Sequence, residues 1–280
     1  MEVNYVDLGG AVLKNFGRDK DDIPNEAANW FYESFPIQGL IWTRENAKLC
    51  YYFTEKPDGD GFTKQGNKIT GFKSRSKYHP INAVIRRGEI TTAALPGKKK
   101  HCAVFPRSEL GTCLEVEARI SDENIYTVAV VTVKFDEKVL TTRQQVYTNL
   151  NRALTALGNQ FTIYGVNNKP NNMQIQPPHG FDDWMTIWIQ WGTATDPASH
   201  VYIITENGLV DKAFTTNYGS SEKLRIGALP GGGDGFMGSM AAFEVFTSTE
   251  RFPSSELRRL IIEDHQTLVR KTEKGIKVVE

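Results

Sequence analysis

The stretch WMTIWIQW at residues 184–191 begins the part of the chain that decides the fold. It is the first of five apolar runs, which are separated by turn signals and end in FMGSMAAFEVFTSTERFP at residues 236–253. Short runs of β-branched and aromatic residues at such intervals are typical of an antiparallel β-sandwich. We therefore predict an all-β protein.

The first run has two distinct faces, because successive side chains of a strand point to opposite sides of its sheet. One face is apolar and belongs in a core, and it carries Met185, Ile187, Ile189 and Trp191. The other face is mixed and carries Trp184, Thr186, Trp188 and Gln190.

The turn residues between the later runs predict which loops and turns connect them. In VYIITENGLV at residues 201–210, Asn207-Gly208 is a strong signal for a hairpin turn between two adjacent strands. The Gly-rich stretch PGGGDG at 230–235 is a loop before the last run. After Pro253 the apolar period becomes helical, which predicts one short C-terminal helix.

Residues 224–261, LRIGALPGGGDGFMGSMAAFEVFTSTERFPSSELRRLI, resemble the end of a concanavalin A-like lectin/glucanase domain of the laminin G and pentraxin-like branch. Members of that branch commonly finish with a Gly-rich loop, a G-F-x-G-x-apolar strand and a short helix opened by Pro. Residues 184–210 and 88–117 are similar to earlier strands of the same domain. The resemblance covers roughly residues 40–268 and implies a jelly-roll sandwich of two antiparallel sheets, one of them concave.

This resemblance implies three parts of the chain. Residues 38–269 form the jelly-roll domain, residues 1–37 an N-terminal extension or arm, and residues 270–280 a charged tail. Within the arm, the aromatic residues of 25–35 predict a short helix or turn packed on the sandwich. Residues 142–157 have apolar positions at helical spacing, whereas the family usually has strands there, so both interpretations stay open.

Charge and hydropathy exclude some classes of partner. The 33 basic and 33 acidic residues balance, which argues against a nucleic-acid-binding protein. Lys98, Lys99, Lys100, Arg86 and Arg87 make a local basic island, either solvated or able to attract an acidic glycan or matrix. The sequence contains no run of 18 apolar residues, so it predicts no membrane-spanning helix. The N-terminus lacks signal-peptide features, so the protein is either extracellular with its leader removed, as the resemblance implies, or cytoplasmic.

Three cysteines leave at least one without a partner inside the chain. Cys102 and Cys113 lie on two candidate strands joined by a turn, where they could form a cross-strand disulfide or remain buried thiols. Cys50, within the apolar LCYYF, is expected to be buried.

No pattern for enzymatic chemistry stands out. The glucanase arrangement E-x-D-x-x-E is absent, and the nearest string, Glu115-Val116-Glu117, is interpreted as a solvent-facing strand edge. The sequence also lacks G-x-S-x-G, H-E-x-x-H and C-x-x-C motifs. An enzyme is therefore the minority hypothesis.

Calcium is the one cofactor that the sequence suggests. Asp58 and Asp60 gather two carboxylates on the tight loop KPDGDG at 56–61, although a plain turn explains the same residues. The resemblance adds Asp234 in the Gly-rich loop, followed by Asp182 and Asp183, as further candidates on the rim of the sandwich.

The mixed face of the first run is the candidate ligand site. Trp184 and Trp188 could stack on a pyranose while Thr186 and Gln190 hydrogen-bond its hydroxyls. Loop residues Asn207 and Asp234 complete the set of candidate ligand-binding residues. The alternative is that both tryptophans pack beneath another layer or the C-terminal helix.

Three functions follow as hypotheses. The first is a lectin-like module that recognises a glycan or another extracellular ligand. The second is a structural or adhesive subunit of a matrix or filament that self-assembles through the arm at 1–37. The third is a glycan-active hydrolase or lyase with a dispersed site.

Overall fold

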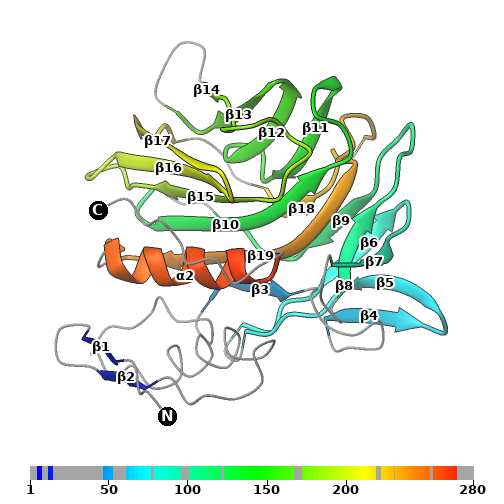
Figure 1. Ribbon diagram of the computed structural model, residues 1–280, viewed down its shortest axis with the longest axis horizontal. Coiled ribbons are helices and arrows are strands. Elements are labelled where there is room, and N and C mark those ends of the chain that lie inside the picture. The colour runs from blue at the N-terminus through cyan, green and yellow to red at the C-terminus, as the bar shows by residue number, and fades with distance from the viewer. Residues whose placement is uncertain are drawn as a thin grey trace.

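Two antiparallel sheets pack face to face in the computed structural model, and one helix lies along one of them (Figure 1). The structure describes residues 5–7, 12–14, 47–52, 61–76, 79–95, 101–120, 123–166, 172–218, 222–229, 231–252 and 255–269. The prediction of an all-β antiparallel sandwich is confirmed. Within these ranges, no helix has both the length and the apolar character needed to cross a bilayer.

The first sheet is named the β10 sheet after its central strand. In spatial order its described strands are β17 (Gly208–Thr215), β16 (Ala198–Thr205), β15 (Met185–Trp191), β10 (Tyr126–Phe135), β19 (Gly238–Ser248), β8 (His101–Phe105) and β7 (Thr91–Ala94). Strand β3 (Leu49–Tyr52) also pairs with β19.

The second sheet is named the β9 sheet. In spatial order its described strands are β14 (Asn172–Ile175), β13 (Gln160–Tyr164), β12 (Ala153–Gly158), β11 (Leu140–Thr148), β18 (Leu224–Ile226), β9 (Cys113–Val116), β6 (Ala83–Arg87), β5 (Lys68–Phe72) and β4 (Phe62–Gln65). Apart from both sheets, β1 (Tyr5–Asp7) pairs with β2 (Val12–Lys14).

The main core fills the space between the two sheets. From the β10 sheet it receives the face of β15 that the alternation assigned to the interior, namely Met185, Ile187, Ile189 and Trp191, all buried. From the β9 sheet it receives Leu114, Val116, Leu224 and Ile226. Each such side chain contributes about 1.5–3 kcal/mol by leaving water, so the alternation at these strands fixes which face remains outside.

One connection follows its predicted form, and one open alternative is decided. Strands β16 and β17 make the hairpin around Asn207-Gly208, with Thr205 opposite Gly208. Residues 142–157 belong to strands β11 and β12 rather than to a helix. The register of the β11–β12 pairing shifts at two places. The two strands are joined by a turn at 149–152, so the apolar positions of 142–157 do not follow one continuous two-residue alternation.

Helix α2 (Ser255–Thr267) confirms the predicted C-terminal helix. It contacts β10 and β15 on the outer face of the β10 sheet (Figure 1). Its buried residue Ile261 belongs to a second apolar cluster, together with Trp188 and Phe252. The predicted helix or turn at 25–35 and the tail at 270–280 lie outside the described residues, and the division into arm, domain and tail stays a prediction.

Candidate functional site

A row of four directly opposed residues crosses the outer face of the β9 sheet. Strand pairing sets Val84 of β6 opposite Glu115 of β9, Glu115 opposite Arg225 of β18, and Arg225 opposite Thr148 of β11. The neighbours of Glu115 along its strand, Leu114 and Val116, point into the core. The row therefore faces outward on the sheet that α2 does not cover.

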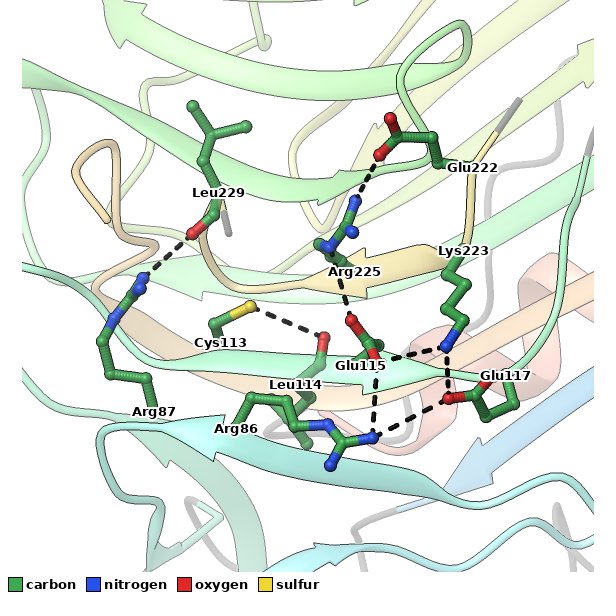
Figure 2. A network of polar contacts seen from close by, with 10 residues as sticks. All are labelled: Arg86, Arg87, Cys113, Leu114, Glu115, Glu117, Glu222, Lys223, Arg225 and Leu229. Atoms are coloured by element: carbon green, nitrogen blue, oxygen red, sulfur yellow. Dashed lines mark hydrogen bonds and ion pairs between the residues drawn. The ribbon is translucent and has the colours of Figure 1, made fainter. Parts of the chain in front are cut away.

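Glu115 is the centre of a charged network on this face, drawn in Figure 2. Its Oε1 lies 3.3 Å from Arg86 Nη2 and 3.6 Å from Lys223 Nζ, and its Oε2 lies 3.7 Å from Arg225 Nε. The three cations come from β6 and from the β18 region on the two sides of β9, so cross-strand neighbours of opposite charge surround one carboxylate. We call Arg86, Glu115, Glu117, Glu222, Lys223 and Arg225 the Glu115 network.

Arg225 is the least exposed cation of the network, with 15% of its side chain accessible. Its Nη1 donates to Glu222 Oε2 at 2.8 Å. Its Nε is buried and makes no hydrogen bond, because Glu115 Oε2 lies beyond hydrogen-bond distance. Among the described residues, no acceptor is paired with its Nη2. Nη2 is thus the donor of this guanidinium that an external ligand could use.

The network carries no net charge. Its three carboxylates, Glu115, Glu117 and Glu222, balance its three cations, Arg86, Lys223 and Arg225. The hydrogen bond from Lys223 Nζ to Glu117 Oε1, 2.6 Å long, raises the pKa of the lysine. The six side chains together offer donors and acceptors without a strong field of either sign, an arrangement suited to a neutral polar ligand.

Arg87, the next residue of β6, forms hydrogen bonds to the loops that contain Leu110 and Leu229. Its guanidinium donates to the carbonyls of Leu110 and Gly111 at 2.8 and 3.2 Å, and to that of Leu229 at 2.9 Å. Together these bonds tie two loops to the end of β6. Of the predicted basic island, Arg86 is paired with carboxylates and Arg87 donates to backbone carbonyls.

The predicted sugar-binding face of β15 lies under α2. Trp188 and Thr186 are buried, Gln190 is nearly so, and Trp184 is partly buried. Trp188 packs edge-on against Phe252, with ring centroids 4.9 Å apart. A side chain without accessible surface cannot stack on a sugar, so the expectation for Thr186 and Trp188 is corrected in favour of packing beneath the C-terminal helix.

A series of buried side-chain hydrogen bonds holds α2 on this face. His265 Nε2 donates to Glu244 Oε2 at 3.1 Å, and His265 Nδ1 lies 2.9 Å from Thr132 Oγ1. Thr132 in turn contacts Thr186 at 3.0 Å, while the Cys50 thiol donates to Glu244 Oε1 at 3.2 Å. These polar groups satisfy one another in the interior. Thr186 therefore has a structural partner, and no local sequence pattern indicates it because the hydrogen-bonded residues come from five separate elements.

Asn207 and Asp234 lie on two separate loops. Asn207 is exposed at the tip of the β16–β17 hairpin, where its carbonyl accepts a hydrogen bond from His179 Nε2 at 3.3 Å. Asp234 is 3.8 Å from Arg143 Nη1, and its carbonyl accepts a hydrogen bond from the Gln145 amide. The structure does not bring either residue into the Glu115 network, and their role in binding stays a prediction.

The calcium hypothesis is not resolved by the described residues. Asp58 and Asp60 lie outside them, and Asp182 and Asp183 are exposed ahead of β15. In the ranges that the structure describes, no group of three or more His, Cys, Asp or Glu side chains could hold a metal ion.

The cross-strand disulfide is contradicted. Cys102 belongs to β8 in the β10 sheet, and Cys113 belongs to β9 in the β9 sheet, so the two strands do not form the predicted hairpin. Both cysteines are buried thiols that form no disulfide with a described residue, and Cys50 is likewise a buried thiol outside any such disulfide. Buried thiols, the other alternative, fit this arrangement.

Sequence reasoning missed the Glu115 network. Glu115 and Glu117 were interpreted as a plain solvent face, although Glu115 is only 19% exposed and contacts three cations. A usable signal exists in retrospect: Lys223 and Arg225 alternate along one strand as Glu115 and Glu117 do along another. Only the pairing of β9 with β18 brings these two patterns together.

Comparison with known proteins gives likeness at the level of structure. No family model matches the chain, and no curated protein matches it by sequence. The binding domain of botulinum neurotoxin DC, solved in complex with rat synaptotagmin II, is similar with a TM-score of 0.51 and 11% identity, over 79% of this chain and 52% of that one. The chain thus spans about half the length of that neurotoxin domain.

Two further solved structures are similar with lower scores. Domain 4 of AbnA, a GH43 extracellular arabinanase from Geobacillus stearothermophilus in complex with arabinotriose, matches with a TM-score of 0.44 and 16% identity, over 80% of this chain and 98% of that one. The Trypanosoma rangeli sialidase in complex with sialic acid matches with a TM-score of 0.49 and 12% identity, over 78% and 33%. At 11% identity, the likeness to the neurotoxin domain concerns the fold alone.

Proposed function

We propose that this protein is a glycan-recognition module that binds sugar hydroxyls on the outer face of the β9 sheet, with Arg225 and Glu115 at the centre of the site. The observation that carries the proposal is the Arg225 guanidinium, which is held beside Glu115 and whose Nη2 has no acceptor among the described residues. A sugar hydroxyl both donates and accepts, so a guanidinium and a carboxylate side by side can bind it from both directions.

Helix α2 covers part of the outer face of the β10 sheet, and this supports placing the site on the β9 sheet. Helix α2 and its polar chain cover Thr186 and Trp188, which removes the aromatic surface expected from the sequence. The β9 sheet presents its charged row outward instead, on strands held from below by the main core. A site built on strands positions its groups more rigidly than a site on loops.

The finer classification is part of the proposal. The jelly-roll resemblance of residues 224–261 supports placing the chain in the concanavalin A-like branch, and fold alone does not fix function. An extracellular location, a matrix partner, a calcium ion on the 56–61 loop and self-assembly through the arm likewise remain proposals without further support from the described residues.

A glycan array with three proteins tests the proposal. Wild-type protein is expected to bind a subset of neutral glycans, and Arg225→Gln is expected to lose that binding because the substitution removes the charged, fork-shaped donor. Arg107→Gln is the control, since Arg107 is an arginine that pairs with a glutamate, Glu137, but is largely exposed and is not a member of the Glu115 network.

Three outcomes decide the proposal. Binding by wild type and Arg107→Gln but not by Arg225→Gln supports it. An array on which wild type binds nothing, with added calcium and with a chelator, contradicts glycan recognition. Equal binding by all three proteins contradicts the location of the site.

A further inference from the structure

Leu150 has a backbone conformation that leucine rarely adopts. Its φ is +77°, and Asp234 is the one other non-glycine residue with positive φ among the described residues. In this left-handed region the Cβ of an L-residue crowds the following carbonyl oxygen, which costs stability. Glycine or asparagine is the usual choice there, so a leucine requires an explanation.

Packing does not supply that explanation. The Leu150 side chain is 58% exposed, so little apolar burial offsets its strain. The turn holds it in place: the Leu150 amide donates to Thr148 Oγ1 at 3.1 Å, and the Arg152 amide donates to Asn149 Oδ1 at 2.8 Å. A strained backbone held at a hairpin tip under an exposed side chain is typical of a functional position.

The strained turn adjoins the Glu115 network. Thr148, whose hydroxyl fixes the Leu150 amide, is the residue opposite Arg225. The carbonyl of Asn149 accepts a hydrogen bond from the Glu222 amide at 3.0 Å, and the Glu222 carboxylate holds Arg225. Leu150 therefore follows the Thr148 end of the row by two residues.

We propose that Leu150 is a specificity-determining residue that contacts the methyl group of an acetamido substituent, so that the module prefers glycans containing N-acetylhexosamine. This inference rests on the proposed glycan site. An acetamido group places an amide next to a methyl group, which matches a neutral set of donors and acceptors next to one leucine. The flat face of an unsubstituted pyranose is suited to an aromatic ring.

The test compares two trisaccharides that differ at the substituent. Chitotriose and cellotriose share their β-1,4 linkage, and chitotriose carries an acetamido group where cellotriose carries a hydroxyl. Calorimetric titration of wild type is expected to show chitotriose binding on the order of fourfold more tightly, the gain for burying about one methyl group. Leu150→Ala and Leu150→Gly should lose this preference while keeping the wild-type affinity for cellotriose.

Two internal controls separate the possible results. Leu157→Ala removes an exposed leucine on β12 and should keep the preference. Thermal unfolding of Leu150→Gly should shift to higher temperature, since glycine adopts positive φ freely.

Equal affinity of wild type for the two sugars, or a preference that survives Leu150→Ala, overturns the inference and leaves the glycan site standing. Failure of wild type to bind either trisaccharide while it binds other array glycans also overturns the inference alone. Failure to bind any array glycan removes the proposed function itself.

Discussion

Arg225 and Glu115 occupy directly opposed positions on β18 and β9, and yet Arg225 Nε and Glu115 Oε2 are 3.7 Å apart. This separation keeps the two charges within ion-pair distance but exceeds the length of a hydrogen bond. The pair therefore fixes the geometry of the face without saturating its own hydrogen-bonding groups, which is the property that the proposed ligand site needs.

The same separation predicts a weak contribution to stability. In a double-mutant cycle of Glu115→Gln and Arg225→Gln, the coupling free energy should be below about 1 kcal/mol, because the network borders on water and each residue has other partners. Urea unfolding at low and high salt measures it, and added salt should reduce it further. A coupling of several kcal/mol that resists salt would show that the pair serves mainly to hold the fold.

The buried pair of His265 and Glu244 should behave differently. Both side chains are fully buried, so His265→Ala takes a partner from an interior carboxylate and is expected to lower the free energy of unfolding by roughly 3 kcal/mol. His179→Ala, on the surface beside Asn207, should cost less than about 0.5 kcal/mol. Urea denaturation of both variants provides the comparison. Similar losses in the two variants would contradict the role of His265 in fastening α2.

Two buried tyrosines predict opposite effects of the same substitution. The Tyr147 hydroxyl is buried and makes no hydrogen bond, whereas the Tyr51 hydroxyl donates to the Ile81 carbonyl at 2.8 Å. Tyr147→Phe should leave stability unchanged or raise it, while Tyr51→Phe should cost about 1 kcal/mol. Thermal and urea unfolding check the order of the two variants, and the reverse order would mean that Tyr147 binds an interior acceptor.

The buried thiols predict how stability changes at alkaline pH. Burial raises the pKa of Cys102 and of Cys113 above the ordinary thiol value of 9.0. A raised pKa in the folded state means that the stabilisation is complete below pH 9 and is lost as the pH rises through the folded-state value, because the unfolded chain releases its thiol protons first.

The unfolding free energy should therefore fall above about pH 9, and the fall should be shallower in Cys102→Ala/Cys113→Ala. Without reductant, a thiol reagent should react slowly with native protein and count three thiols after unfolding, one for each cysteine. A count of one thiol would show that the other two cysteines form a disulfide.

The parts of the fold that were predicted correctly depend on local patterns. The alternation at Met185–Trp191 identified the core face, and Asn207-Gly208 identified the hairpin, because both signals are contained in a few neighbouring residues. The disulfide prediction failed because it assumed that consecutive strands pair, whereas β8 and β9 enter different sheets. The partner of a strand is decided by the whole topology.

The candidate site shows the same limit. Trp188 alternates as a surface residue does, but α2 returns from the end of the chain to cover it. Glu115 and Arg225 are 110 positions apart in the sequence and meet through a single pairing of short strands. The strain at Leu150 depends on a turn conformation with positive φ. The sequence of that turn contains no glycine, which is the residue that would indicate such a conformation.

Hydrogen–deuterium exchange in the presence of the strongest array glycan tests the central claim most directly. The account predicts that backbone amides slow their exchange around Val84–Arg87, Glu115–Glu117 and Lys223–Arg225, and that Arg225→Gln abolishes this protection. Protection confined to β15–β17 and α2, with the β9 sheet unchanged, would contradict it.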